Sequence, residues 1–343
     1  MQPWDLINPV DATTFARLVP DDYPDTLLQW LPQREVQDVR ARTARVQRTN
    51  STAAFRSWNA ESPIGERGVT KTITEVRFPP ISEKLPLDEI DRIELFLAAR
   101  SGTSDPAFEQ ILEAAYDDIA TISRRIRNRM ELARGDVLTD GKFTITENGL
   151  SGLEADFGLV SGQKPTAGTL WSNPAAPAID HELAWMLYLQ NLSGKPVTRA
   201  LTSLTVVQYL QANEQYRQYR WPTGDISTLP NLTQAEVNQI RASLGLPPIT
   251  IYDHQLSVNG STTRVIPVNK FLLGVADLGE TQWGITPDAL DLVKSGAVVT
   301  RDAPGLVAGT WQTTDPTTKW TKVSGCGMPI IGDNTGLLTA TVA

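Results

Sequence analysis

One long amphipathic helix constrains the fold of this chain more than any other feature of its sequence. Asp105 and Pro106 form a helix start signal, because aspartate caps free amides and proline needs no donor at the first helical position. Apolar residues then follow at helical spacing: Phe108, Ile111, Ala115, Ile119, Ile122, Ile126, Met130 and Ala133. This spacing predicts a core-facing stripe on a helix over 106–133 that is about 42 Å long, more than twice the mean length. We expect Arg134-Gly135-Asp136 to end the helix.

Charge is divided along this helix. Acidic residues lie in its first half and arginines in its last part, which suits the helix dipole. The arginines are Arg124, Arg125, Arg127, Arg129 and Arg134. Such a cluster can hold phosphates, but it more often forms a solvated helix face. The sequence leaves both interpretations open.

The residues before the helix predict an extended hairpin. Val69–Phe78 is rich in β-branched residues, and Ser62–Gly68 has the composition of a turn, so residues 43–80 are expected to form two long limbs. Neither face of the second limb has a consistent apolar pattern. Because a two-stranded hairpin is marginally stable in water, this one must lie either on another copy of the chain or back on its own domain.

Residues 1–47 predict a basic arm. Its prolines restrict it to short helices, because proline removes a donor and clashes inside a helix. The arginines that follow have few acids among them: Arg34, Arg40, Arg42, Arg45 and Arg48. The arm would lie against another chain or nucleic acid, or stay solvated.

Beyond the long helix, the chain predicts an α+β pattern. Helices are expected over 180–192, 203–219, 233–244 and 286–294, and strands over 142–146, 156–160, 197–201, 249–253, 265–268, 271–276, 319–323, 328–331 and 337–342. The first of these helices has a partial apolar stripe, made of Ala184, Leu187, Tyr188 and Leu192.

Composition argues against several functional classes. The chain has 343 residues with 31 basic and 39 acidic side chains, and its net charge of −8 disfavours tight, sequence-independent binding of nucleic acid. No apolar run approaches the ~18 residues of a membrane helix. The first residues lack a basic stretch followed by an apolar block, so we expect a cytoplasmic protein without a secretory signal.

Residues suited to catalysis or metal binding are few. Asp180-His181-Glu182 looks like a ligand set, but adjacent helical residues point in different directions, and a helix start capped by Asp180 explains it better. The single cysteine, Cys326, is expected to be a small buried hydrophobe. Walker, dinucleotide-binding and nucleophile-elbow motifs are missing from the sequence. We therefore predict no catalytic, cofactor or metal site and no enzymatic activity.

Four sequence cues resemble one protein family. They are Asp105-Pro106-Ala107, then Val137-Leu138 with Gly141–Thr146, then Leu170-Trp171-Ser172 ahead of Asp180, and finally Trp311–Pro316, Lys319–Thr321 and Met328–Ile331. In this order, the chain resembles major capsid proteins of tailed double-stranded DNA bacteriophages, in the lambda-like capsid protein E family with the Hong Kong 97-type fold. The cues span residues 105–343, whereas the arm and hairpin match in order alone.

The resemblance implies an α+β fold with five parts. These are an N-terminal arm (1–47), an extended β-hairpin loop (48–86), a peripheral domain with the long spine helix (87–180), an axial domain (181–310) and return strands of the peripheral domain (311–343). It also implies that arm and loop contact neighbouring copies. The candidate inter-subunit residues are Arg40, Arg42, Arg45, Arg56, Trp58, Arg67, Lys71 and Glu75.

As a structural protein, such a subunit would self-assemble as hexamers and pentamers into an icosahedral shell around the phage DNA. The expected location is the virion capsid, after assembly and procapsid maturation in the host bacterial cytoplasm. The implied partners are a separate scaffolding protein, a portal protein, a decoration protein where one exists, and packaged DNA in weak, non-specific contact. No membrane is implied.

Two other functions stay open from the sequence. One is an encapsulin-like compartment, a shell of the same fold that encloses protein cargo, which a cargo-binding pocket would favour. The other is a soluble α+β enzyme, which would need a cleft with convergent titratable groups.

Overall fold

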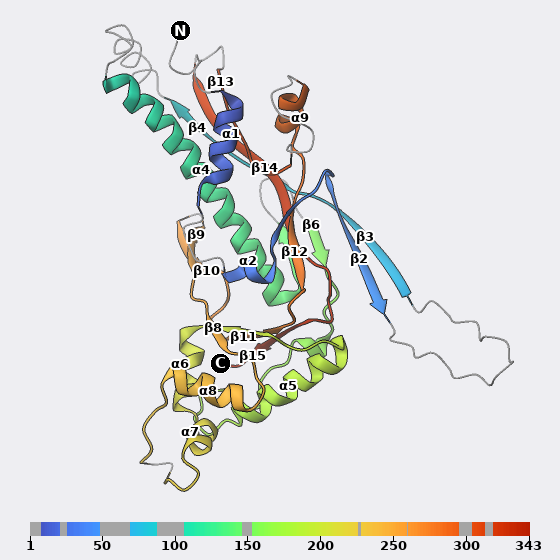
Figure 1. Cartoon of the computed structure of the whole chain (residues 1–343), viewed down its shortest axis with the longest axis vertical. Coiled ribbons are helices and arrows are strands. Elements are labelled where there is room, and N and C mark those ends of the chain that lie inside the picture. The colour runs from blue at the N-terminus through green and yellow to red at the C-terminus, as the bar shows by residue number, and fades with distance from the viewer. Residues whose placement is uncertain are drawn as a thin grey trace, which may run out of the picture.

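The computed structural model shows an elongated α+β chain with two bodies and a projecting hairpin (Figure 1). The larger body, called the β14 body, is built on helix α4 (Pro106–Asp140) and a five-stranded sheet around strand β14 (Lys319–Ile331). The smaller one, called the β11 body, holds a four-stranded sheet around strand β11 (Lys270–Gly274) and several helices. The structure describes residues 8–20, 26–48, 69–87, 106–145, 153–225, 228–258, 260–294, 304–312 and 318–343.

Helix α4 confirms the predicted apolar stripe where its side chains are described. Four stripe residues are almost completely buried between the helix, the sheet and the N-terminal helix: Ile119, Ile122, Ile126 and Met130. Phe108, Ile111 and Ala115 have side chains outside the described set. The stripe therefore holds α4 along the β14 body, as Figure 1 shows.

The expected end of this helix at residues 134–136 is wrong. The helix continues to Asp140 and stops at Gly141, which has a left-handed φ of 67° and whose amide donates to the Val137 carbonyl at 2.9 Å. Gly135 has another role, because a Cβ there would lie 2.3 Å from the Val265 carbonyl oxygen. This glycine allows a close approach of two segments instead of ending the helix.

The β14 body is organised by one long central strand. Strand β4 (Pro80–Leu87) and strand β13 (Val307–Gln312) pair with opposite sides of its first half, and β12 (Gly279–Trp283) pairs with its last residues. Strand β1 (Gln33–Glu35) runs parallel to β12 and ends the sheet. The prolines of β4 fit its place, because a strand at a sheet edge tolerates residues without a donor.

The β11 body has a sheet that is covered on both faces. The strand order is β15 (Leu337–Thr341), β11, β7 (Arg199–Thr202) and β8 (Ile249–Ile251). In the central strand, Phe271 and Leu273 pack among the helices, whereas Leu272 points into the cluster that joins the two bodies. The helices are α5 (Ala178–Ser193), α6 (Leu204–Ala212), α7 (Glu214–Arg220) and α8 (Gln234–Ser243).

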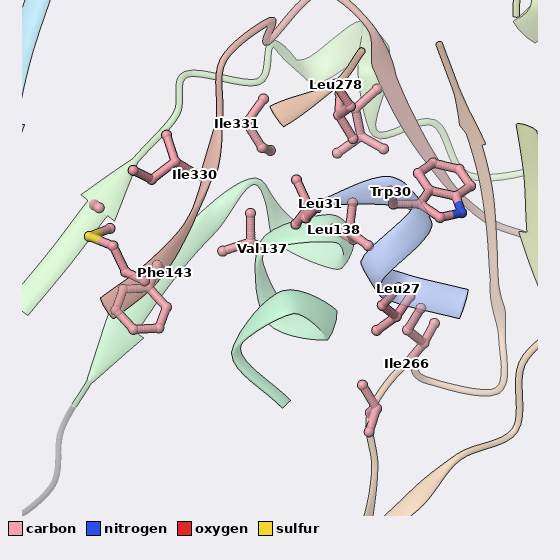
Figure 2. Packing of buried hydrophobic residues seen from close by; sticks show 14 of the residues in the cluster. Leu27, Trp30, Leu31, Val137, Leu138, Phe143, Ile266, Leu278, Ile330 and Ile331 are labelled. Atoms are coloured by element: carbon pink, nitrogen blue, oxygen red, sulfur yellow. The ribbon is translucent and has the colours of Figure 1, made fainter. Parts of the chain in front are cut away.

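A hydrophobic cluster joins the two bodies. Figure 2 shows side chains of the short helix α2 (Thr26–Trp30) and its next residue Leu31 against Val137 and Leu138 at the end of α4. Ile330 and Ile331 from the end of β14 lie in the same cluster. The end of α4 is thus fixed by residues from the beginning, middle and end of the sequence.

The remaining described elements are short. They are α1 (Pro9–Leu18), β5 (Lys142–Ile145), β6 (Leu153–Asp156), η2 (Ser161–Gln163), β9 (Gln255–Val258), β10 (Ser261–Arg264) and α9 (Pro287–Lys294). Two expected strands differ from the structure. Strand β6 ends at Asp156, the first residue of the strand expected over 156–160. Residues 265–268, where another strand was expected, follow β10 without forming one. The single helix expected over 203–219 is two helices, because Asn213 ends α6 and caps α7 by accepting from the Tyr216 amide.

The sheets divide the chain differently from the expected boundaries. Strand β15 pairs with β11, so the tail 311–343 does not return as a whole to the sheet of the β14 body. Strand β12, which was not expected from the sequence, lies in the segment 181–310 assigned to the axial domain but pairs with β14. Both differences arise from pairing between distant segments, which local patterns do not encode.

Candidate inter-subunit surfaces

The hairpin is the most extended surface of the chain. Strands β2 (Arg40–Arg48) and β3 (Val69–Arg77) pair antiparallel over nine positions, from Arg40 opposite Arg77 to Arg48 opposite Val69. In Figure 1, this ladder leads away from both bodies. Among the described strands, none adds to either of its edges. The outer edges of β2 and β3 therefore have backbone donors and acceptors that no described strand pairs with.

Among the side chains that the structure describes, those at the base of the hairpin contact the body. Ala41 and Phe78 are buried in the joining cluster, and Val76 packs against it. The Phe78 amide donates to the Val39 carbonyl at 3.0 Å, and the Asp38 carboxylate accepts from the Val39 and Arg40 amides at 2.7 and 3.2 Å. These contacts orient the two strands where they leave the core.

The structure brings part of the predicted contact set together at this base. The Arg40 guanidinium is 3.2 Å from the Glu75 carboxylate, with both side chains about half exposed, so the pair contributes little to stability. The ladder sets Arg42 opposite Glu75, and places Arg45 and Lys71 farther along, opposite Thr72 and Val46. The other predicted contacts are outside the described residues: Arg56, Trp58 and Arg67.

Helix α1, which lies in the expected arm, packs on the chain's own body. The Thr13 hydroxyl donates to the Ala308 carbonyl and accepts from the Ala308 amide, both at 3.2 Å. The Arg127 guanidinium of α4 donates to carbonyls at the end of α1, including those of Arg17 and Val19. A helix end leaves such carbonyls without partners, so Arg127 satisfies them from outside.

The arginine cluster of α4 is therefore only partly a solvated face. Arg134 is buried, with its Nη1 2.7 Å from Glu131 and its Nε donating to the Thr281 hydroxyl at 2.9 Å. Arg125 pairs with Glu83 at an exposed position. Arg125, Arg127 and Arg134 make contacts within the chain, and the buried Arg134 is not available for phosphate.

The residues considered for chemistry have structural roles. The His181 Nδ1 accepts from the Trp171 indole at 3.2 Å, and its ring stacks on Trp185. The expectation that Asp180 caps helix α5 is wrong, because that helix begins directly after Pro177. Burial lowers the pKa of His181 and raises the pKa of Cys326 to about 11, so the thiol is a poor nucleophile.

One groove, of about 880 Å³, runs between β4, α4 and β5. Its floor is apolar, with Ile126, Met130 and Phe143, and its polar groups include Arg129 and Asp136. Burial raises the pKa of Asp136. Within the described ranges, no group of three or more His, Cys, Asp or Glu side chains could hold a metal ion. The described residues that line the groove include no histidine and no cysteine.

The sequence missed one surface. The apolar stripe on α5 faces outward, with Leu187 58% exposed and Tyr188 and Leu192 more than one third exposed. Its spacing identified the helix, but a helix with apolar residues on two sides does not reveal which side faces the core.

Two solved structures are similar to this chain over almost its whole length. The chain is similar to the putative capsid protein of a prophage in E. coli CFT073, at a TM-score of 0.64 and 15% identity over 100% of this chain and 99% of that one. It is also similar to a phage-related protein from Bordetella bronchiseptica RB50, at 0.54 and 9% over 98% and 97%. These likenesses show the Hong Kong 97-type fold. No curated protein matches the chain significantly.

A family model decides between the alternatives. The model of phage major capsid protein E matches residues 23–342, which is almost the whole chain. The family match favours a structural role in a phage capsid over an encapsulin-like compartment. This chain belongs to the phage major capsid protein E family.

Proposed function

We propose that this capsid protein builds its shell from hexamers and pentamers, and that the β2–β3 hairpin holds neighbouring copies together. The observation that carries the proposal is the hairpin's lack of support beyond its base, among the described residues. Nine paired residues reach about 30 Å at ~3.3 Å per residue. A two-stranded ladder of that length is marginal in water, so a neighbouring surface stabilises it.

The proposed contacts are the charged residues of this hairpin. Arg40, Arg42, Arg45 and Lys71 give the ladder a cationic excess over Glu75. A chain with net charge −8 offers acidic surfaces to such a hairpin, so the attraction between copies is electrostatically favourable. Arg56, Trp58 and Arg67 belong to the same proposal through their place between the two strands in the sequence.

The five-part division is proposed with altered borders. The β14 body corresponds to the peripheral domain with its spine helix, and the β11 body corresponds to the axial domain around the symmetry axes. Strands β12 and β13 then join the peripheral part, and β15 joins the axial part. Helices α1 and α2 pack into core clusters of their own chain, so we assign the contact with neighbouring copies to the hairpin.

The wider setting is also part of the proposal. We expect a structural subunit without catalysis, located in the virion capsid after assembly in the bacterial cytoplasm. A separate scaffolding protein, a portal protein and, where present, a decoration protein would act with it. The acidic net charge of the chain is consistent with a capsid shell that contacts packaged DNA weakly.

A shortened hairpin tests the proposal. Replacing residues 44–73 by Asn-Gly closes the ladder directly after the Thr43–Thr74 pair with a favoured two-residue turn, and leaves Ala41 and Val76 at the base. The variant and the unchanged chain are each produced with the phage's scaffolding protein. Thermal unfolding measures the fold, and electron microscopy measures the shells.

We expect the shortened chain to unfold at nearly the same temperature as the unchanged chain and to form no closed shells. Normal shells from the shortened chain would refute the role of the hairpin. A matched variant, Arg34→Ala, removes one exposed ion pair with Glu280 on the body and is expected to leave shells intact.

A further inference from the structure

Helix α5 has apolar residues on two sides. Its inner side packs into the β11 body through Ile179 and Leu189, which are buried. Its outer side has Leu187 at 58%, Leu192 at 39% and Tyr188 at 37% exposure. A helix with apolar side chains all round is normally buried on both sides. The outer stripe is thus a surface that the single chain leaves uncovered.

The outer stripe continues beyond the helix. The Tyr188 ring lies against the Gly162 backbone, since a Cβ on that glycine would be 2.4 Å from the tyrosine hydroxyl. Val160, next to this contact, is 46% exposed. We call Val160, Leu187, Tyr188 and Leu192 the α5 patch. It combines aliphatic area with an aromatic ring, the composition typical of an interface core.

A second exposed apolar patch lies at the start of α6. Leu204 is 48% and Val268 37% exposed, and the two segments are held together by the Ser203 hydroxyl, which donates to the Val268 carbonyl at 2.7 Å. The Leu204 amide donates to the Asp253 carboxylate, which also pairs with Arg264. We call Leu204 and Val268 the α6 patch. It has an apolar centre with a charged rim, as interfaces do.

The two patches belong to different sides of the same body. In Figure 1, α6 lies on one side of the β11 body, and α5 extends to the other. A contact between two different surfaces of identical chains is heterologous, and it closes into a ring when the rotation between copies closes. One patch that met its own copy would instead give isolated pairs.

We infer that the α5 patch of one copy packs on the α6 patch of the next copy, and that this contact closes the rings of the shell. The inference rests on the proposed assembly into hexamers and pentamers. The occupant is a second copy because the chain belongs to a capsid family whose members assemble with themselves, and because the same chain offers both surfaces.

Site-directed crosslinking tests the pairing. Leu187→Cys and Leu204→Cys are prepared as separate full-length proteins, assembled into shells with the scaffolding protein, and treated with a bismaleimide. The native Cys326 is buried and serves as the background in the unchanged chain. A matched control combines Leu187→Cys with Leu290→Cys, because Leu290 is a similarly exposed leucine on α9 in the other body.

We expect linked dimers only when Leu187→Cys and Leu204→Cys subunits are mixed, and a ladder up to the ring size when one chain has both substitutions. Each single variant alone, and the Leu290→Cys control, should stay monomeric on a denaturing gel. Self-linking of Leu187→Cys alone would overturn the heterologous contact, as would a mixture without dimers. Shells of the unchanged chain, seen by electron microscopy, test the proposed function separately, since they can form even if this pairing is wrong.

Discussion

A buried ion pair in the β11 body gives the sharpest stability prediction. Arg241 of α8 and Glu182 of α5 are fully buried and form an ion pair, and the Tyr216 hydroxyl of α7 donates to the same carboxylate at 2.9 Å. The Arg241 Nε also donates to the Pro247 carbonyl at 3.1 Å. Three helices and a loop thus meet at one carboxylate and one guanidinium.

The perturbation is Arg241→Met, which keeps the volume of the side chain and removes its charge. Glu182 then remains buried with Tyr216 as its described donor, and breaking a buried pair in this way costs about 3–5 kcal/mol. This loss lowers the folded-to-unfolded ratio by roughly two to four orders of magnitude, at about 1.36 kcal/mol per tenfold change. Such a cost is a large share of the ~5–15 kcal/mol that stabilises a typical domain.

The assay is urea unfolding of the unassembled chain, followed by circular dichroism. The triple variant Glu182→Leu, Tyr216→Phe and Arg241→Met removes every charged and hydroxyl partner together, and we expect it to be more stable than Arg241→Met alone. The control Arg220→Met removes an exposed arginine 3.8 Å from Glu236, with an expected change under about 0.5 kcal/mol. A triple variant that is less stable than Arg241→Met would refute the reasoning.

Two further predictions concern the core and the pH dependence. Ile122→Asp places a carboxylate at a fully buried position of α4 and should cost several kcal/mol in thermal unfolding, whereas Ile122→Val should cost about 0.5–1.5 kcal/mol; equal effects would show that the stripe does not face the core. Burial raises the pKa of Asp333, but hydrogen bonds from Lys195 and Thr335 outweigh it and keep the pKa below its ordinary value of 3.8. The folded carboxyl therefore binds its proton more weakly than the unfolded one, and its stabilisation is present at neutral pH and lost as the pH falls below 3.8. The melting temperature of the unchanged chain should exceed that of Asp333→Asn near pH 7, with a gap that narrows in acid; a constant gap would contradict this.

Features set by local periodicity could be predicted from the sequence. The stripe from Ile119 to Met130 repeats every three or four residues, so it fixed both the helix type and its buried side. The order of short cues around this helix was enough to suggest the family, which the match over residues 23–342 then showed. Such features need no knowledge of distant contacts.

Features set by distant contacts could not be predicted. Gly135 has the composition of a helix end, but its role depends on Val265, 130 residues later in the chain. The outward direction of Leu187 depends on which side of α5 meets the sheet. The division of the tail between two sheets likewise depends on pairing of β15 with β11, which no short segment specifies.

Helix α1 illustrates a misleading local signal. Prolines and arginines in residues 1–47 predicted an arm against another chain or nucleic acid, or in solvent, whereas Ala12 and Ala16 of α1 are fully buried in this chain. The small side chains allow the helix to approach β13 closely, and Arg127 from α4 completes its end. The Arg127 guanidinium lies more than one hundred residues later in the chain, so no local pattern around α1 reveals this contact.

The late position of β14 and β15 has a consequence for biosynthesis. The central strand of one sheet spans Lys319–Ile331, and an outer strand of the other spans Leu337–Thr341, so a ribosome makes both after the other described strands. Without these residues, one sheet lacks its central strand and the other lacks an outer strand. A chain cut short before Lys319 would leave β4, β12 and β13 without the strand with which all three pair.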